Sequence, residues 1–69
     1  MEIKELNLSK RAMSFISRTN AYLKRNNRSE LLTAEDLLSE GSYLKRYAGC
    51  GPVIFNEIQQ ALSYNLMVF

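Results

Sequence analysis

The spacing of apolar positions predicts a long helix over about residues 9–25. Apolar side chains and one threonine recur there every three or four residues, as one helix face requires: Ala12, Phe15, Ile16, Thr19, Tyr22 and Leu23. Ser9 precedes this pattern and is a good N-cap, because its hydroxyl can accept a hydrogen bond from a free N–H group of the first turn. Asn26 and Asn27 mark the expected end, since asparagine tolerates the left-handed conformation that closes many helices.

Shorter apolar patterns predict three further helices. Thr33 to Asp36 resembles a capping box, with aspartate as a shorter stand-in for the usual Glu or Gln, and opens a short helix that ends near Gly41. Residues 42–48 predict a second short helix. From Pro52 to about residue 64 a third pattern has helical spacing: Ile54, Phe55, Ile58, Ala61 and Leu62. The chain therefore belongs to the all-α class.

The stretch YAGCGPVI, residues 47–54, joins the last two predicted helices and holds two of the three glycines and the single proline. Gly49 is placed to end one helix, and Gly51 lets the backbone turn again. Pro52 suits the first position of the next helix, where its missing N–H costs nothing. Cys50 would point inward and fix the turn to the core. Free N–H groups near Gly51 and at the helix start would attract an anion such as a DNA phosphate.

Composition excludes several classes of function. Sixty-nine residues make one domain, residues 1–69, with a small core. One cysteine and no histidine leave no internal disulfide, no metal site and no cofactor to expect, and a reduced, cytoplasmic setting is the simple interpretation. We find no membrane span and no signal peptide. No nucleophile has a recognisable base beside it, so we expect no catalytic residues and no enzyme.

Charge is distributed unevenly along the chain. Residues 1–28 hold seven basic and two acidic side chains, a net +5, whereas residues 29–69 carry a net −3. A basic first half could meet phosphate or an acidic protein surface. The alternative is an ordinary solvated helix face.

The residues around the turn resemble the helix-hairpin-helix motif, which reads apolar-x-Gly-apolar-Gly-Pro with an apolar position further on. Here the motif is YAGCGP at 47–52, followed by Ile58. Nearly the whole chain is also similar to the C-terminal domain of the bacterial RNA polymerase alpha subunit. The segments that carry this resemblance are ELNLSKR at 5–11, LLTAEDLL at 31–38 and GCGPVIFNEIQQAL at 49–62. An insertion of about ten residues falls around 17–30.

This resemblance implies a compact bundle of four to five short helices that binds the DNA minor groove and contacts transcription factors. It places the main DNA-contacting arginine of the family on Arg11, and a contacting asparagine on Ser14. The family also has a Lys and a Ser after the hairpin glycine, which meet phosphate. This chain has Val53 and Ile54 there, so the charged partner is missing.

Two functions follow as hypotheses. The first is a small DNA-binding, transcription-associated module that contacts the backbone and minor groove of AT-rich duplex DNA. Its expected contact residues are Arg11, Ser14, Lys10, Gly49, Gly51, Lys24 and Arg25. The second is a protein-interaction module, a monomer or weak homodimer. It would bind RNA polymerase, a transcription factor or itself through Val53 and Ile54 or the apolar tail 66–69.

The four tyrosines allow two interpretations. Tyr22, Tyr43, Tyr47 and Tyr64 could stack on bases, as aromatic residues do in proteins that bind single strands. They fall near apolar helix faces, however, and packing in or beside the core is the favoured interpretation. For the tail 66–69, docking back on the bundle is favoured over pairing with another chain.

Overall fold

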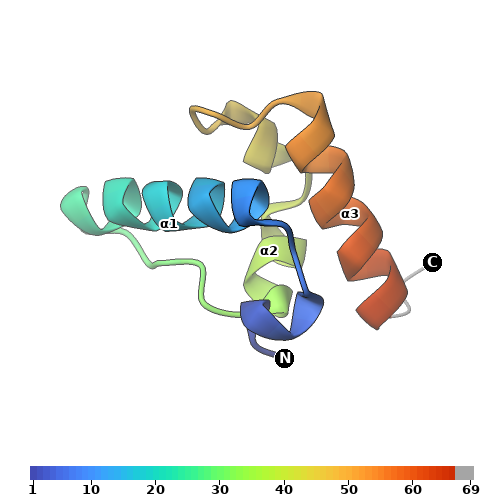
Figure 1. Cartoon of the computed structure of the whole chain (residues 1–69). Helices are drawn as coiled ribbons and strands as arrows, with labels where there is room; N and C mark the ends of the chain where they lie inside the picture. Colours follow the sequence, from blue (N-terminus) through green and yellow to red (C-terminus); the bar gives the residue numbers. More distant parts are fainter. Residues whose placement is uncertain (67–69) are drawn as a thin grey trace.

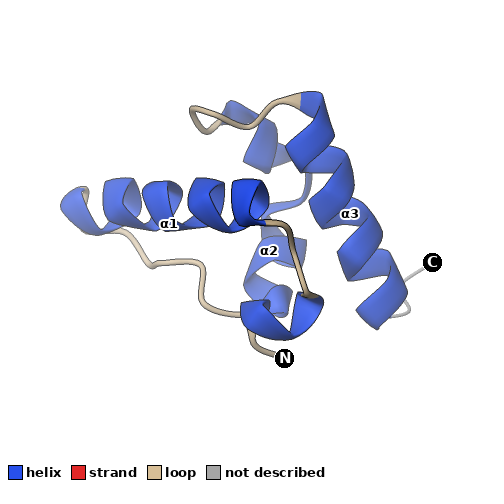
Figure 2. Cartoon of the chain, viewed as in Figure 1, coloured by secondary structure: helices blue, strands red, loops and turns tan. Residues whose placement is uncertain are grey.

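The computed structural model describes residues 1–66, which form helices joined by short loops (Figure 1). Three are α-helices: α1 (Lys10–Arg25), α2 (Ala34–Glu40) and α3 (Pro52–Leu66). Two short 3₁₀ helices, η1 (Ile3–Leu6) and η2 (Gly41–Arg46), precede α1 and follow α2. The described residues contain no strand, only an isolated bridge between Glu2 and Thr33 (Figure 2). The expectation of an all-α chain is confirmed.

Side-chain caps define the starts of α1 and α2. The Ser9 hydroxyl accepts a hydrogen bond from the N–H group of Ala12 at 3.2 Å, as expected for the N-cap of α1. At α2, the Thr33 hydroxyl accepts from the Asp36 N–H at 3.1 Å, and an Asp36 carboxylate oxygen accepts from the Thr33 N–H at 3.1 Å. The capping box is therefore complete, and the shorter aspartate does close it.

Two segments differ from the prediction. The helix expected over 42–48 is the 3₁₀ helix η2, which ends at Arg46, and Tyr47 then adopts an extended conformation. Gly49 lies two residues further on with φ +88°, so it has the positive φ expected of it but is not the residue that ends η2. The helical turn η1 was not predicted, because residues 2–8 alternate only weakly.

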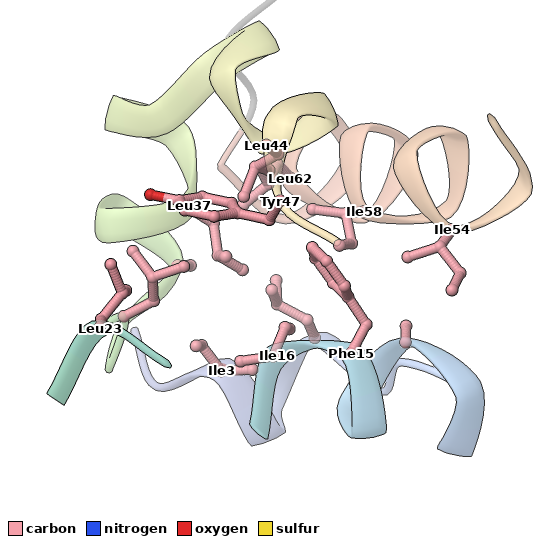
Figure 3. Close-up of a cluster of buried hydrophobic side chains, with 14 residues drawn as sticks. Ile3, Phe15, Ile16, Leu23, Leu37, Leu44, Tyr47, Ile54, Ile58 and Leu62 are labelled. Carbon is pink, nitrogen blue, oxygen red and sulfur yellow. The ribbon is translucent and has the colours of Figure 1, made fainter. Parts of the chain in front are cut away.

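One apolar core joins all five helices. Figure 3 shows Phe15 and Ile16 of α1 pointing toward the side of α3 that carries Ile58 and Leu62. The largest fully buried side chains are Phe15, Leu23, Leu37, Leu44, Ile58 and Leu62. Because each helix contributes apolar side chains to this one cluster, its burial supplies the main drive for folding.

The ends of the last predicted helix are close to those found. α3 begins at Pro52 as expected and continues to Leu66, two residues beyond the predicted end. Leu66 is partly buried against the core, whereas the rest of the predicted docking tail, 67–69, lies outside the described residues. Within residues 1–66, every helix is too short or too polar to cross a lipid bilayer.

Candidate functional site

A pocket of about 530 Å³ lies between the C-terminal half of α1, η2 and the hairpin, which is the name used here for residues 47–51. In Figure 1 the hairpin is the loop at the top that leads into α3. Arginine and tyrosine side chains form most of the wall. The lining residues are Arg18, Thr19, Tyr22, Arg25, Arg28, Tyr43, Arg46, Tyr47, Ala48 and Gly49. We call this site the arginine–tyrosine pocket.

α1 contributes one continuous stripe of exposed side chains to this side of the molecule. Arg11, Arg18 and Arg25 follow one another at intervals of seven residues, or two helical turns, so they share a face. Ser14 and Tyr22 fall between them on the same face, and all five residues are exposed. The Nε of Arg18 donates a hydrogen bond to the carbonyl oxygen of Ser14 at 3.4 Å, which holds the arginine along the helix.

The end of α1 folds Arg28 back toward the pocket. Asn27 has φ +56°, the left-handed conformation that ends a helix. The Asn27 N–H donates to the Lys24 carbonyl at 3.1 Å, and the Arg28 N–H donates to the Leu23 carbonyl at 2.9 Å. These two bonds are those of a Schellman motif. The predicted stop at Asn26 and Asn27 is confirmed, and the turn explains why Arg28 joins Arg25 at one site.

η2 and the residue after it supply aromatic rings. The Arg46 guanidinium lies over the Tyr43 ring, 5.4 Å from its centroid. The Tyr43 and Tyr47 rings meet edge to face, with centroids 5.5 Å apart. The Tyr47 hydroxyl donates to Glu40 Oε1 at 2.7 Å. Burial, together with this bond, raises the pKa of Tyr47 to about 12.

The hairpin backbone closes the pocket against Arg18. A Cβ placed on Gly49 would lie 3.6 Å from Arg18 Nη2, so the guanidinium is in contact range of the hairpin. The Gly51 N–H, which we expected to face outward, donates to the Gly49 carbonyl at 3.2 Å. The N–H groups of Ala48 and Gly49 have no hydrogen-bond partner within residues 1–66, and they are the free donors at this edge.

The pocket is strongly positive. Its wall contains four arginines and no carboxylate among the described residues. Within residues 1–66, ion pairs form only elsewhere, between the N-terminus and Glu35 and between Lys4 and Glu2. No carboxylate of the described residues is therefore paired with these four guanidinium groups. Guanidinium groups bind phosphate oxygens in a bidentate geometry. The described residues hold no cluster of three or more metal-ligating side chains.

The structure brings together some of the predicted contact residues. Arg25 and Gly49 line the pocket, and Arg11 and Ser14 continue the α1 stripe beyond it. By contrast, neither lysine lines the pocket: Lys24 lies on another face of α1 with Ser17 and Ala21, and Lys10, four residues before Ser14, lies at the edge of the stripe. Gly51 does not line the pocket.

The predicted partner surface is reduced to one residue. Val53 is 63% exposed, as a partner contact requires, but Ile54 is only 6% exposed and belongs to the core. The prediction of Ile54 as a partner contact is therefore wrong, because the first turn of α3 directs that side chain inward against the cluster. Cys50 is partly buried against the same core, as expected, and burial raises the pKa of its thiol.

Sequence reasoning missed most of the pocket. Arg18 and Arg46 were not among the predicted contacts, although the seven-residue spacing of Arg11, Arg18 and Arg25 is visible in the sequence. The interpretation of the tyrosines as core or half-buried residues is confirmed for Tyr47, which is buried, and for Tyr22 and Tyr43, which are about half exposed, and it is wrong for Tyr64. Tyr22, Tyr43 and Tyr64 are 48%, 43% and 83% exposed.

Comparison of this chain with protein-family models, with curated proteins and with solved structures finds no match.

Proposed function

We propose that this protein is a small DNA-binding, transcription-associated module, and that the arginine–tyrosine pocket and the α1 stripe contact the DNA backbone and minor groove. The observation that carries this proposal is the gathering of Arg18, Arg25, Arg28 and Arg46, from three segments of the chain, around one pocket without a carboxylate in its wall. Contacts between such side chains and phosphate dominate the affinity of most proteins for DNA.

The arrangement of η2, hairpin and α3 supports the resemblance to the helix-hairpin-helix motif and to the alpha C-terminal domain of RNA polymerase. The chain has Val53 and Ile54 where that family has a Lys and a Ser after the hairpin. In this protein the positive charge next to the hairpin comes instead from Arg18 of α1, whose guanidinium lies against Gly49. The proposed interface therefore includes the side of α1 next to the hairpin, so that the hairpin and α1 together hold the phosphate.

Arg11 would enter the minor groove at the other end of the stripe. Arginine is drawn into narrow minor grooves of AT-rich DNA, where the negative potential is strongest. Arg11 lies about 21 Å from Arg25 along α1, at 1.5 Å per residue. The stripe is thus long enough for Arg11 to reach a groove while the pocket holds a neighbouring phosphate.

The alternative, a protein-interaction module without DNA binding, has less support. Of its two expected surfaces, the start of α3 has Ile54 buried and Val53 alone exposed, and the other, the tail 66–69, lies mostly outside the described residues.

An NMR titration of the full chain with an AT-rich duplex, at low and at moderate salt, tests the proposal. We expect salt-sensitive shifts of the backbone amides of Arg11, Arg18, Arg25 and Gly49, with those of Lys10 and Lys24 moving less. Affinity should fall steeply with salt, by about 0.9 in log K per unit of log salt for each phosphate contact. The absence of shifts at low salt would refute DNA binding, and shifts confined to Val53 and its neighbours would favour the alternative.

A further inference from the structure

Phosphate binding does not account for the aromatic half of the pocket. Tyr22 and Tyr43 are about half exposed, and both line the pocket. A tyrosine contacts phosphate through its hydroxyl, so phosphate binding makes no use of the exposed faces of these two rings. Aromatic rings in a basic groove are instead the usual platform on which unpaired bases stack.

We infer that the arginine–tyrosine pocket receives one unstacked nucleotide of a nucleic-acid strand, with its base against a tyrosine ring and its phosphate on the arginines. The inference rests on the proposed DNA binding and names what the same site takes. A volume of about 530 Å³ falls in the range of roughly 300–1,000 Å³ that is usual for small-ligand pockets.

Arg46 contributes to the same platform. Its guanidinium covers the Tyr43 ring, and a guanidinium plane is itself a surface on which bases stack. Arg18, Arg25 and Arg28 surround the pocket from the α1 side and provide the charge for the phosphate of that nucleotide. One site therefore offers an aromatic surface for the base and positive charge for the phosphate of a nucleotide.

The pocket is expected to tolerate any base. No Asn, Gln, Asp or Glu side chain lines it among the described residues, and these side chains read the edges of adenine and cytosine; the arginines, which can read guanine, are assigned here to the phosphate. The Tyr47 hydroxyl is occupied by Glu40, so it offers no free proton to a base. Stacking, which every base can do, remains as the source of binding.

A comparison of deoxyadenosine monophosphate with inorganic phosphate on the full chain tests the stacking directly. Both carry similar charge, so phosphate contact alone gives similar affinities. We expect the nucleotide to bind at least about fivefold more tightly, the low end of what one base–aromatic stack contributes. Tyr22→Leu and Tyr43→Leu should lose this difference and keep the affinity for inorganic phosphate. Equal affinities in the unchanged protein would overturn the inference.

Tyr64→Leu is the matched control, because Tyr64 is 83% exposed on α3 and does not line the pocket. It should leave the nucleotide preference unchanged, and a loss as large as that of Tyr22→Leu would contradict the placement of the base.

A second experiment tests whether the pocket binds a nucleotide that is part of a strand, and not only a free nucleotide. A duplex with one bulged nucleotide should bind more tightly than the same duplex fully paired, and Tyr22→Leu should remove the gain. Equal binding of the two duplexes would reject an extruded nucleotide while leaving duplex binding intact. Failure of both duplexes to bind would instead refute the proposed function.

Discussion

Glu57 of α3 holds Ser9, the residue that caps α1, with both of its carboxylate oxygens. Oε2 accepts a hydrogen bond from the Ser9 N–H at 2.6 Å, and Oε1 accepts one from the Ser9 hydroxyl at 2.8 Å. The same hydroxyl accepts from the Ala12 N–H at 3.2 Å. One carboxylate on the last helix thereby fixes where the first α-helix begins, and with it the position of the α1 stripe relative to the hairpin.

This link predicts a loss of stability in acid. The hydrogen bonds from the Ser9 N–H and hydroxyl lower the pKa of Glu57 below its ordinary 4.5. Because the folded protein holds the charged form, the stabilisation is fully present above pH 4.5. It is lost as the pH falls through the lower folded pKa. Urea unfolding at a series of pH values should show the free energy of unfolding falling below pH 4.5, and this fall should be smaller in Glu57→Gln.

At neutral pH, Glu57→Gln should lower the free energy of unfolding by about 1 kcal/mol, the usual net contribution of one hydrogen bond. Glu30→Gln is the control, because it removes the same charge from an exposed residue that forms no side-chain hydrogen bond within residues 1–66. Equal stability of the two variants would show that the Glu57–Ser9 contact contributes nothing.

The two hairpin glycines should respond differently to substitution. Gly49 has φ +88°, which an alanine adopts only with strain, although its nearest contact would be an unremarkable 3.6 Å. Gly49→Ala should therefore destabilise the fold by about 1–2 kcal/mol. Gly51 has no positive φ and no atom within 4 Å of a Cβ placed on it, so Gly51→Ala should be close to neutral. Thermal unfolding of both variants measures this contrast, and equal melting temperatures would contradict it.

Asn20 holds the connection between α1 and α2 in place. Its amide donates to the Leu31 carbonyl at 2.8 Å and accepts from the Leu31 N–H at 2.7 Å, while the Leu31 side chain is buried. Asn20→Ala leaves both backbone groups without a partner and should cost about 2 kcal/mol. For a chain of this size, that cost lowers the melting temperature by roughly 10 °C. Asn56→Ala, at an exposed position of α3, should change it little, and a similar loss in both variants would argue against this bond.

Local signals explain which parts of the fold the sequence could predict. Ser9 and Thr33 accept hydrogen bonds from N–H groups of the next turn, and Pro52 has no N–H that needs a partner, so each start of an α-helix follows from a few adjacent residues. The contacts of Asn20 with Leu31 and of Glu57 with Ser9 join residues 11 and 48 positions apart, and no local pattern announces them. η1 has a local capping box between Glu2 and Glu5, but it also buries Ile3 and Leu6, and that burial depends on the assembled core.

Only part of the site was predictable, on α1 and at one residue of the hairpin. Arg25 and Gly49 were expected contacts, and the stripe from Arg11 to Arg25 can be drawn from the sequence alone. Arg28 joins the pocket because the chain reverses at Asn27, and Arg46 joins because η2 packs beside the hairpin. Both depend on the tertiary arrangement. The family resemblance places the charged contacts at Val53 and Ile54, at the start of α3, whereas in this protein Arg18 of α1 lies next to the hairpin.

Arg25 and Lys24 provide the most direct test of the central claim, that the arginine–tyrosine pocket is the DNA contact surface. They are adjacent, both are exposed near the end of α1, and only Arg25 lines the pocket. The measurement is the affinity of Arg25→Gln and Lys24→Gln for one AT-rich duplex at several salt concentrations. We predict that Arg25→Gln weakens binding and lowers the slope of log K against log salt by about one, as loss of one phosphate contact requires, while Lys24→Gln changes neither by a comparable amount. Equal effects of the two substitutions would contradict the account, because they would show that net charge, and not the pocket, governs binding.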